Sequence, residues 1–406
     1  MIIIKGTVTS PRGFLASGVK AGIKKSGKKD LGILYSEAPC VAAAAFTTNA
    51  FKASPVKISQ LHLKNKIHQA VIVNSGNANC ANGKSGDRNA RIMTEYAANA
   101  LGLNKTEVLV ASTGIIGHTL PIEKIRDAIP QLVAGISSEG GLDFSQAILT
   151  TDTRRKERTV KLELGKAIVT IAGTCKGVGM IYPQMKTQIH ATALAFVTTD
   201  AAISKKMLER ALSEAIEDSF NMVSVDGDMS TNDSCFILAN ALAGNKRIVS
   251  EGKDYNKFAK GLKFLLKELA KMIVSDGEGA TKFIEIRVNG ASSKSDAIKV
   301  ARKISTSNLL KCCVFGEDPN WGRVVAAAGS SGARLDPDRV DVYLGGIKVL
   351  ANGSVIKGYD KDKAKKLFEE KNIKIELDLK SGVYEATAWT CDLSKQYVAI
   401  NSEYST

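Results

Sequence analysis

Histidine and cysteine, the residues that most often bind transition metals, are scarce in this chain. It has only four histidines, none at the spacing of a metal-binding motif, and seven scattered cysteines with no CxxC pair. An odd number of dispersed cysteines is not a disulfide framework and is typical of reduced thiols. We therefore expect neither a disulfide-stabilised fold nor a metal site.

Long apolar runs are also absent. No segment approaches the roughly 20 consecutive apolar residues that span a bilayer. Residues 1–8 form a β-prone run that is too short for a signal peptide. The sequence therefore predicts a cytoplasmic protein that has no membrane partner.

Aromatic residues make up only 6% of the chain, although its net charge is +15. A basic chain suggests nucleic acid as a partner. Its lysines, however, occur in small dispersed groups without the interleaved aromatic residues on which bases stack, for example at 24–29 and 361–366. We favour a solvated basic surface, which attracts small anionic substrates, over the alternative of a nucleic-acid-binding protein.

The chain does contain many strand and helix signals, and its 406 residues are enough for two or three domains. Helical spacing predicts helices over 88–101, 204–220 and 257–274. Apolar or alternating runs predict an apolar strand that begins at Thr192 and further strands at 69–73, 108–111, 159–172 (a hairpin), 283–288, 340–344, 347–350, 373–379 and 383–390. β-rich ends around a helical middle predict an α+β protein built in layers. Residues 173–190, rich in glycine, proline and polar residues, predict an exposed loop that can be cut.

Two segments look like ligand-binding loops but lack required residues. Ala81–Ser85 has Ala78 where a phosphate-binding loop requires its first glycine. Asp226–Asp233 lacks the glycine and the bidentate glutamate of a calcium loop. Both are interpreted as structural turns.

Three other segments suggest chemistry. Thr113 and Gly114 follow a strand, where a hydroxyl and a backbone N–H can approach a developing oxyanion. Glu278 lies between glycines, so its carboxylate can reach into a pocket and hold an ammonium group. Thr192 opens an apolar strand directly after the predicted loop. Taken singly, the first segment is better interpreted as a strand-ending turn and the second as a solvated helix cap.

Read together, the segments resemble the ornithine acetyltransferase (glutamate N-acetyltransferase) family of arginine biosynthesis. The resemblance covers essentially the whole chain, in order, and rests on residues 73–79, 112–114, 150–153, 176–180, 191–192, 198–201, 230–233, 278–282, 318–323 and 401–406. It implies an N-terminal-nucleophile-like, self-processing α+β architecture with a smaller C-terminal α/β region.

The resemblance also implies that the precursor cleaves itself between Ala191 and Thr192. The products are an α chain of residues 1–191 and a β chain of residues 192–406, which stay associated as a heterotetramer of two α and two β chains. Thr192 is then the nucleophile, and Thr113 and Gly114 form the oxyanion hole. The residues implied to bind substrate are Thr150, Lys176, Thr192, Glu278, Asn401 and Thr406.

The implied reaction moves acetyl from N2-acetyl-L-ornithine to L-glutamate through an acetyl-threonine intermediate. It needs no metal and no cofactor, and some members of the family also use acetyl-CoA as a substrate. The alternative is a self-processing amidase or aminopeptidase of related architecture, in which water is the acceptor.

The loop before Thr192 departs from the family pattern. Residues 186–190 stand between Met185 and Ala191, so counting from Met185 makes Thr187 an alternative nucleophile. We favour Thr192, because an apolar strand follows it directly and none follows Thr187.

Overall fold

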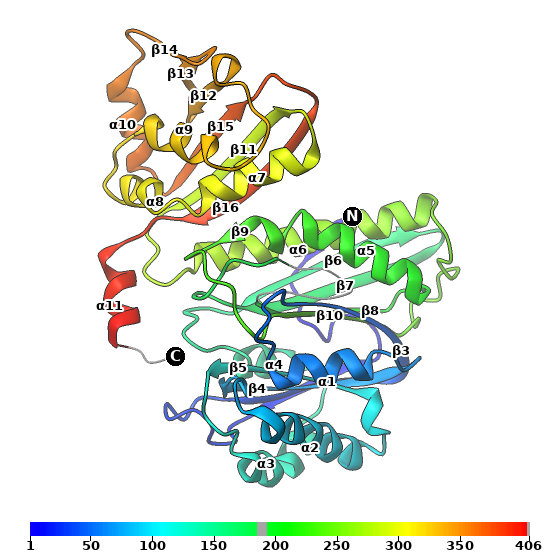
Figure 1. The fold of residues 1–406 in the computed structure, drawn as a ribbon. Coiled ribbons are helices and arrows are strands. Elements are labelled where there is room, and N and C mark those ends of the chain that lie inside the picture. Colours follow the sequence, from blue (N-terminus) through cyan, green and yellow to red (C-terminus); the bar gives the residue numbers. More distant parts are fainter. Residues whose placement is uncertain (185–192, 404–406) are drawn as a thin grey trace.

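Strand β3 (Leu31–Phe46) is the element around which the larger part of the fold is built. The computed structural model of the chain describes residues 1–184 and 193–403. The first half of β3 pairs with β2 and β4, and its second half pairs with β10. The register shifts between Tyr35 and Cys40, and the two halves belong to two stacked strand layers (Figure 1).

The larger sheet has nine strands among the described residues. In spatial order they are β1 (Ile2–Ile4), β6 (Lys156–Leu164), β7 (Ala167–Lys176), β8 (Leu194–Thr199), β10 (Ser234–Ala239), β3, β4 (His68–Asn77) and β5 (Val108–Ile115), with β2 (Phe14–Val19) paired to β3.

Helices cover both outer faces of the paired strand layers, which gives four layers in all (Figure 1). α5 (Lys205–Glu217) and α6 (Lys253–Ser275) pack on one side, and α2 (Gly83–Leu101) and α3 (Ile122–Ala134) on the other. The remaining helices of this body are α1 (Ser54–His62), α4 (Gly141–Ala147) and the short 3-10 turns Lys105–Glu107 and Phe220–Met222. Between the strand layers, the rings of Phe144, Phe196 and Phe236 pack with centroids 5.1 and 5.7 Å apart.

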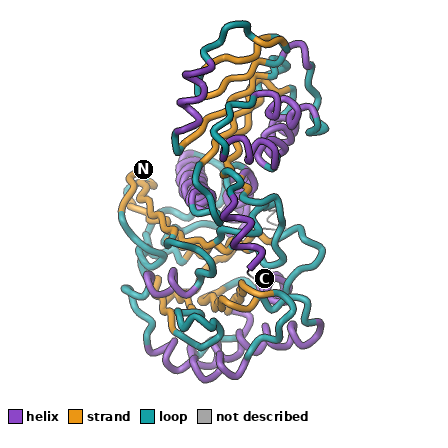
Figure 2. The backbone as a smooth tube through the Cα atoms, turned by 90° about the vertical axis from the view of Figure 1, so that its left-hand side faces the viewer, coloured by secondary structure: helices purple, strands orange, loops and turns teal. Residues whose placement is uncertain are grey.

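A smaller α/β region follows within residues 283–391. Its sheet has seven described strands in the order β14 (Ser354–Val355), β13 (Ile347–Ala351), β12 (Asp341–Leu344), β15 (Asn372–Asp378), β11 (Phe283–Ala291), β16 (Tyr384–Cys391) and β9 (Val223–Ser224). Its helices are α7 (Lys294–Ser305), α8 (Asn308–Phe315), α9 (Trp321–Gly329), α10 (Lys361–Glu369) and the 3-10 turn Pro337–Arg339. In Figure 1 and Figure 2 this region stands at one end, and α11 (Lys395–Glu403) returns from it toward the larger body.

The expected α+β class, with a smaller C-terminal α/β region, is confirmed. Two details of the prediction are wrong. Residues 173–176 belong to β7 rather than to a loop, because they pair with the first residues of β8 and are buried. The C-terminal third is not mainly β, because α7, α8 and α9 follow β11 in succession and α10 lies between β14 and β15. Residues 185–190 of the predicted loop lie outside the described residues.

No helix among the described residues is long and apolar enough to cross a membrane.

Candidate active site

The ends of three strands of the larger sheet meet beside a cavity of about 380 Å³. Thr113 and Gly114 lie at the end of β5, and Lys176 ends β7 opposite Leu194, the first residue of β8. Thr113, Gly114, Thr150, Glu278 and Asn401 all line the cavity. Residues predicted from distant parts of the sequence therefore share one site.

Thr113 and Gly114 lie where β5 approaches both β4 and Lys176 of β7. Lys176 Nζ donates a hydrogen bond of 3.3 Å to Thr113 Oγ1, so the threonine hydroxyl keeps its own hydrogen for another acceptor. Gly114 has φ +130°, and a Cβ there would lie 2.4 Å from the carbonyl carbon of Gly76. Only glycine fits this close approach of β5 to β4.

The start of β8 is held from the neighbouring loop before β10. Asp233 Oδ1 accepts the N–H of Ala193 at 2.7 Å, and the N–H of Ser234 donates to the Ala193 carbonyl at 2.9 Å. Asn232 Nδ2 donates to the Ser112 carbonyl at 2.9 Å, which ties this loop to β5. These bonds place the beginning of β8 next to Thr113.

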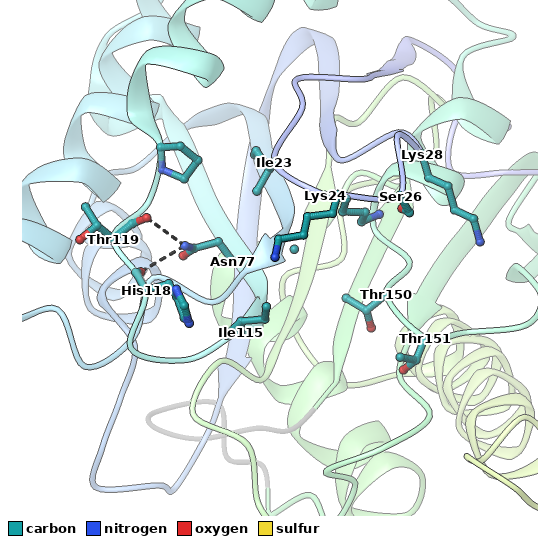
Figure 3. A pocket seen from close by; sticks show the side chains of 13 residues that line it. Ile23, Lys24, Ser26, Lys28, Asn77, Ile115, His118, Thr119, Thr150 and Thr151 are labelled. Carbon is teal, nitrogen blue, oxygen red and sulfur yellow. Dashed lines mark hydrogen bonds between the residues drawn. The ribbon is translucent and has the colours of Figure 1, made fainter. Parts of the chain in front are cut away.

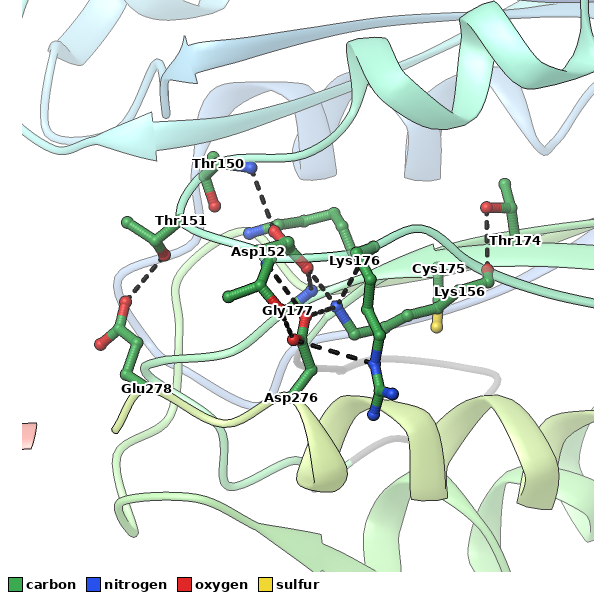
Figure 4. A network of polar contacts seen from close by, with 12 residues as sticks. Thr150, Thr151, Asp152, Lys156, Thr174, Cys175, Lys176, Gly177, Asp276 and Glu278 are labelled. Atoms are coloured by element: carbon green, nitrogen blue, oxygen red, sulfur yellow. Dashed lines mark hydrogen bonds and ion pairs between the residues drawn. The ribbon is translucent and has the colours of Figure 1, made fainter. Parts of the chain in front are cut away.

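A buried network of ion pairs joins Asp152, Lys156 and Asp276 close to the cavity (Figure 4). Lys156 Nζ contacts Asp152 Oδ1 at 2.7 Å and Asp276 Oδ2 at 2.5 Å, and all three side chains are almost completely buried. Asp152 also accepts the N–H of Gly177 at 2.8 Å and the N–H of Thr150 at 3.0 Å. The network therefore fixes the end of β7 and the Thr150 loop together.

The charges of this network shift the pKa values of its members. Burial favours the neutral form of Asp152, but Lys176 and Lys156 lower its pKa to about 2. Burial lowers the pKa of Lys176, and the negative charge of Asp152 opposes that shift. For Lys156, burial acts to lower the pKa, but pairing with Asp152 and Asp276 gives a net rise.

Glu278 lies in the turn after α6 and points into the cavity. Thr151 Oγ1 donates to its Oε1 at 2.7 Å, and Asn401 Nδ2 of α11 donates to its Oε2 at 3.0 Å. A Cβ at Gly179 would lie 2.4 Å from Oε2, so glycine at that position leaves room for the carboxylate. The arrangement presents the Glu278 side chain to the cavity.

The chain that leads toward residue 185 is anchored at several points. Asp226 accepts the N–H groups of Met180 and Ile181 at 2.6 and 2.8 Å. Arg302 of α7 lies 4.2 Å from the ring centroid of Tyr182 and donates to the Pro183 carbonyl at 2.8 Å. This part of the loop is thus held both by the larger body and by the smaller region.

The structure brings together the six described residues that the sequence predicted: Thr113, Gly114, Thr150, Lys176, Glu278 and Asn401. Ala191, Thr192, Thr187 and Thr406 lie outside the described residues, and so does the predicted cleavage site.

The sequence prediction missed the supporting residues of the site, chiefly Asp152, Lys156 and Asp276. A signal was available for one pair, because Asp152 lies in the segment 150–153 that resembles the family and Lys156 follows it four positions later. Asp276 gives no comparable signal. It stands 120 positions from Lys156 in the sequence, and only the fold brings the two side chains into contact.

Among residues 1–184 and 193–403, no group of histidine, cysteine and carboxylate side chains is arranged to hold a metal ion.

Comparisons with known proteins identify the family. The ArgJ family model matches residues 15–406. The chain is 49% identical to the arginine biosynthesis bifunctional protein ArgJ of Symbiobacterium thermophilum, with 99% of both chains covered. It is 46% identical to the protein of the same name from Caldanaerobacter subterraneus, with both chains covered completely.

A solved structure is also similar. The crystal structure of the arginine biosynthesis bifunctional protein ArgJ from Bacillus halodurans matches with a TM-score of 0.50 and 40% identity, over 52% of this chain and 98% of that chain. These matches confirm the family that the sequence motifs predicted.

Proposed function

Since this chain belongs to the ArgJ family of arginine-biosynthesis enzymes, we propose that it transfers acetyl from N2-acetyl-L-ornithine to L-glutamate through an acetyl-threonine intermediate. The observation that carries the proposal is the meeting of Thr113, Gly114, Glu278 and Asn401 at one cavity beside the start of β8.

Self-cleavage between Ala191 and Thr192 is part of the proposal. It separates residues 1–191 from residues 192–406 and gives Thr192 a free α-amine. The Bacillus halodurans chain supports this step, because 98% of it is matched by about half of this chain, as expected for one of two fragments. The next described residue, Ala193, has φ +106°, a backbone conformation that alanine adopts only under constraint.

The new α-amine is the base of the reaction. Its unperturbed pKa of about 7.7–8.0 leaves a useful neutral fraction near physiological pH, and the ammonium of Lys176 lowers that value by repulsion between like charges. The amine accepts the proton of Thr192 Oγ1 as the oxygen attacks the acetyl carbonyl carbon. Thr113 and Gly114 stabilise the oxyanion, and the amine then protonates the departing nitrogen of ornithine.

The second half of the reaction reverses these steps. The neutral amine of glutamate attacks the acetyl-threonine ester, and N-acetyl-glutamate leaves as Thr192 Oγ1 regains its proton. Glu278 binds the side-chain ammonium of ornithine, while Lys176, Asn401, Thr150 and Thr406 bind the carboxylates and orient the acceptor.

Transfer and hydrolysis are separated by one incubation. Purified enzyme is supplied with N-acetyl-ornithine, with and without glutamate. The proposal expects N-acetyl-glutamate when both are present and little free acetate when glutamate is absent. Acetate release that is independent of glutamate would instead identify an amidase.

The proposal assigns no cofactor, and it includes acetyl-CoA as a second acetyl donor. It also includes an assembly of two α and two β chains and no nucleic-acid partner. N-acetyl-glutamate formed from acetyl-CoA tests the donor, and native mass spectrometry tests the assembly.

A further inference from the structure

A second cavity adjoins the first, and its volume of about 750 Å³ is roughly twice as large. Thr150 and Thr151 line both cavities, so they form a shared wall. The loop between β2 and β3 contributes Lys24, Lys25 and Lys28 to the larger one, which we call the lysine cavity (Figure 3).

The charge of the lysine cavity has one sign. None of the described residues that line it is an aspartate or glutamate. Lys25 and Lys28 are exposed and have no hydrogen bond or ion pair with any described residue. Lys24 Nζ donates to the Lys29 carbonyl at 2.8 Å and keeps two further N–H groups. Burial lowers the pKa of Lys24 to about 8, and the negative charges of Asp30 and Asp152 oppose that shift.

The lysine-bearing loop has a fixed shape. The Asp30 carboxylate, which is fully buried, accepts the N–H groups of Ala21 at 2.6 Å, Ile23 at 2.6 Å and Lys24 at 2.8 Å. The Asp30 carbonyl accepts the N–H of Ser75, which connects the loop to β4. The three lysines are therefore presented by a preorganised backbone, and less conformational entropy is lost when a ligand binds.

The rest of the cavity is uncharged. Ile23, Ile115 and Pro121 provide apolar surface, and Asn77 holds the opposite wall by donating to the carbonyls of His118 and Thr119 at 3.1 and 3.2 Å. Figure 3 shows Lys28, Thr150 and Thr151 on one side of the cavity, Asn77 with His118 on the other, and Lys24 between them. A ligand that fits has an anionic group for the lysines and an uncharged stem.

We propose that the lysine cavity binds the phosphate groups of a phosphorylated ligand. The uncharged arm of this ligand extends past Thr150 and Thr151 toward the smaller cavity that Thr113 and Glu278 line, which we call the catalytic cavity. Three ammonium groups on one loop, of which those of Lys25 and Lys28 are unpaired, match the several oxygens of a phosphate or diphosphate. The reach of the arm toward the catalytic cavity rests on the proposed function, whereas phosphate binding does not.

The test uses the full-length enzyme and three probes: coenzyme A, pantetheine and inorganic phosphate. Coenzyme A differs from pantetheine by a diphosphate and a 3′-phosphoadenosine, and inorganic phosphate separates the phosphate contribution from that of the adenosine. Isothermal titration calorimetry is expected to give coenzyme A an affinity about 10-fold or more above that of pantetheine, and this advantage is expected to shrink as salt is added.

The variant Lys25→Ala/Lys28→Ala is expected to lose about 10-fold or more in affinity for coenzyme A, because charged hydrogen bonds are lost. It is expected to bind pantetheine unchanged and to keep its cooperative thermal unfolding, because neither side chain has a partner in the structure. Lys161→Ala/Lys166→Ala removes the same two charges from exposed positions of the β6–β7 hairpin and is the matched control.

The outcomes separate the explanations. Lysine-dependent binding of inorganic phosphate without binding of coenzyme A would identify a free-phosphate ligand and still support the phosphate site. Equal binding of coenzyme A by the double variant, or equal binding of coenzyme A and pantetheine by the wild type, would overturn it. Failure of acetyl transfer from N-acetyl-ornithine would contradict the proposed function without changing these binding results.

Discussion

Lys176 connects the residues that perform the chemistry to the residues that support them. Its ammonium donates to Thr113 Oγ1, and its charge lowers the pKa of the buried Asp152. Asp152 in turn holds the N–H of Gly177, the next residue in the chain. Each of these side chains therefore has an effect on the site that a single substitution can measure.

Thr113→Ala removes one hydrogen-bond donor from the proposed oxyanion hole. Losing such a donor costs about 10²–10³-fold in kcat, and we expect KM to change much less, because the hydroxyl acts mainly in the transition state. Steady-state kinetics on the processed enzyme measures both constants. Thr113→Ser, which keeps the hydroxyl, is the control, and a kcat for Thr113→Ala equal to that of the wild type would remove Thr113 from this role.

Asp152→Asn leaves Lys156 and Lys176 buried with less compensating charge. Breaking a buried ion pair from one side costs about 3–5 kcal/mol, so we expect a loss of that order in the free energy of unfolding at neutral pH. Differential scanning calorimetry or denaturant unfolding measures the loss. Asp127→Asn, at an exposed position with 67% of the side chain accessible, is the matched control and is expected to cost little.

The stabilisation by Asp152 also has a predicted pH dependence. Its pKa is about 2 in the folded protein and about 3.9 in an unfolded chain. A carboxylate with a lowered pKa stabilises the fold above the unfolded value, and this contribution is lost as pH falls through the folded value. The difference in stability between the wild type and Asp152→Asn should therefore shrink from about pH 4 to about pH 2, and a constant difference would contradict this assignment.

At the scale of elements, the site depends on how closely β5 approaches β4 and on how the loop after β7 is anchored. Gly114 has almost no space beyond its own backbone, and Arg302 reaches from α7 to the loop at Tyr182 and Pro183. Both features are set by backbone placement, so each can be tested without removing a reacting group.

Gly114→Ala should displace the end of β5. Its Cβ would lie 2.4 Å from the Gly76 carbonyl carbon and 2.5 Å from the Asn77 nitrogen, both of them backbone atoms. We expect a fall in kcat of about 10²-fold or more, because the oxyanion donors move, together with a lower melting temperature. Gly329→Ala, where no atom lies within 4 Å of the new Cβ, is the control. Full activity in Gly114→Ala would contradict this close approach.

Arg302→Met should slow self-cleavage. The substitution removes the hydrogen bond to the Pro183 carbonyl and the stacking on Tyr182, which hold the chain before residue 185. A charged hydrogen bond contributes about 1.5–3 kcal/mol, which corresponds to a slowing of about 10-fold or more. Gel densitometry over time measures cleavage, and Lys303→Met on the same helix is the control.

Turnover by the cleaved fraction distinguishes positioning from general damage. We expect kcat per cleaved molecule to stay close to the wild-type value in Arg302→Met, because Arg302 does not line the catalytic cavity. An equal loss in cleavage rate and in kcat per cleaved molecule would instead indicate a general structural role.

The sequence predicts strongly periodic elements, but it misses the longest strand, β3, and several helices. The apolar spacing over 257–274 identifies most of α6, and Gly165 with Lys166 identifies the β6–β7 turn. The helices α8 and α9 were missed, because they have only eight and nine residues and follow one another closely. The site residues were predictable where they stand in motifs, whereas Asp276 is defined by a contact over 120 positions.

At the scale of the whole molecule, strands from both proposed fragments share one sheet. β8 and β10 follow residue 192 in sequence, yet they lie between β7 and β3, which precede it. β7 pairs with β8 over six residues, and β10 pairs with β3 over six residues. Cleavage before Thr192 thus leaves both fragments held by strand ladders and by the core between the layers, so we expect them to separate only in denaturant.

The central claim is that Thr192 becomes the first residue of a new fragment and then carries the acetyl group. Intact-mass analysis with N-terminal sequencing, performed on fully active enzyme and on Thr192→Ala, tests it most directly. We predict two fragments of residues 1–191 and 192–406 for the active enzyme, and one uncleaved, inactive chain for Thr192→Ala. A fully active preparation that contains only the original N-terminus, or a new N-terminus at Thr187, would contradict the claim.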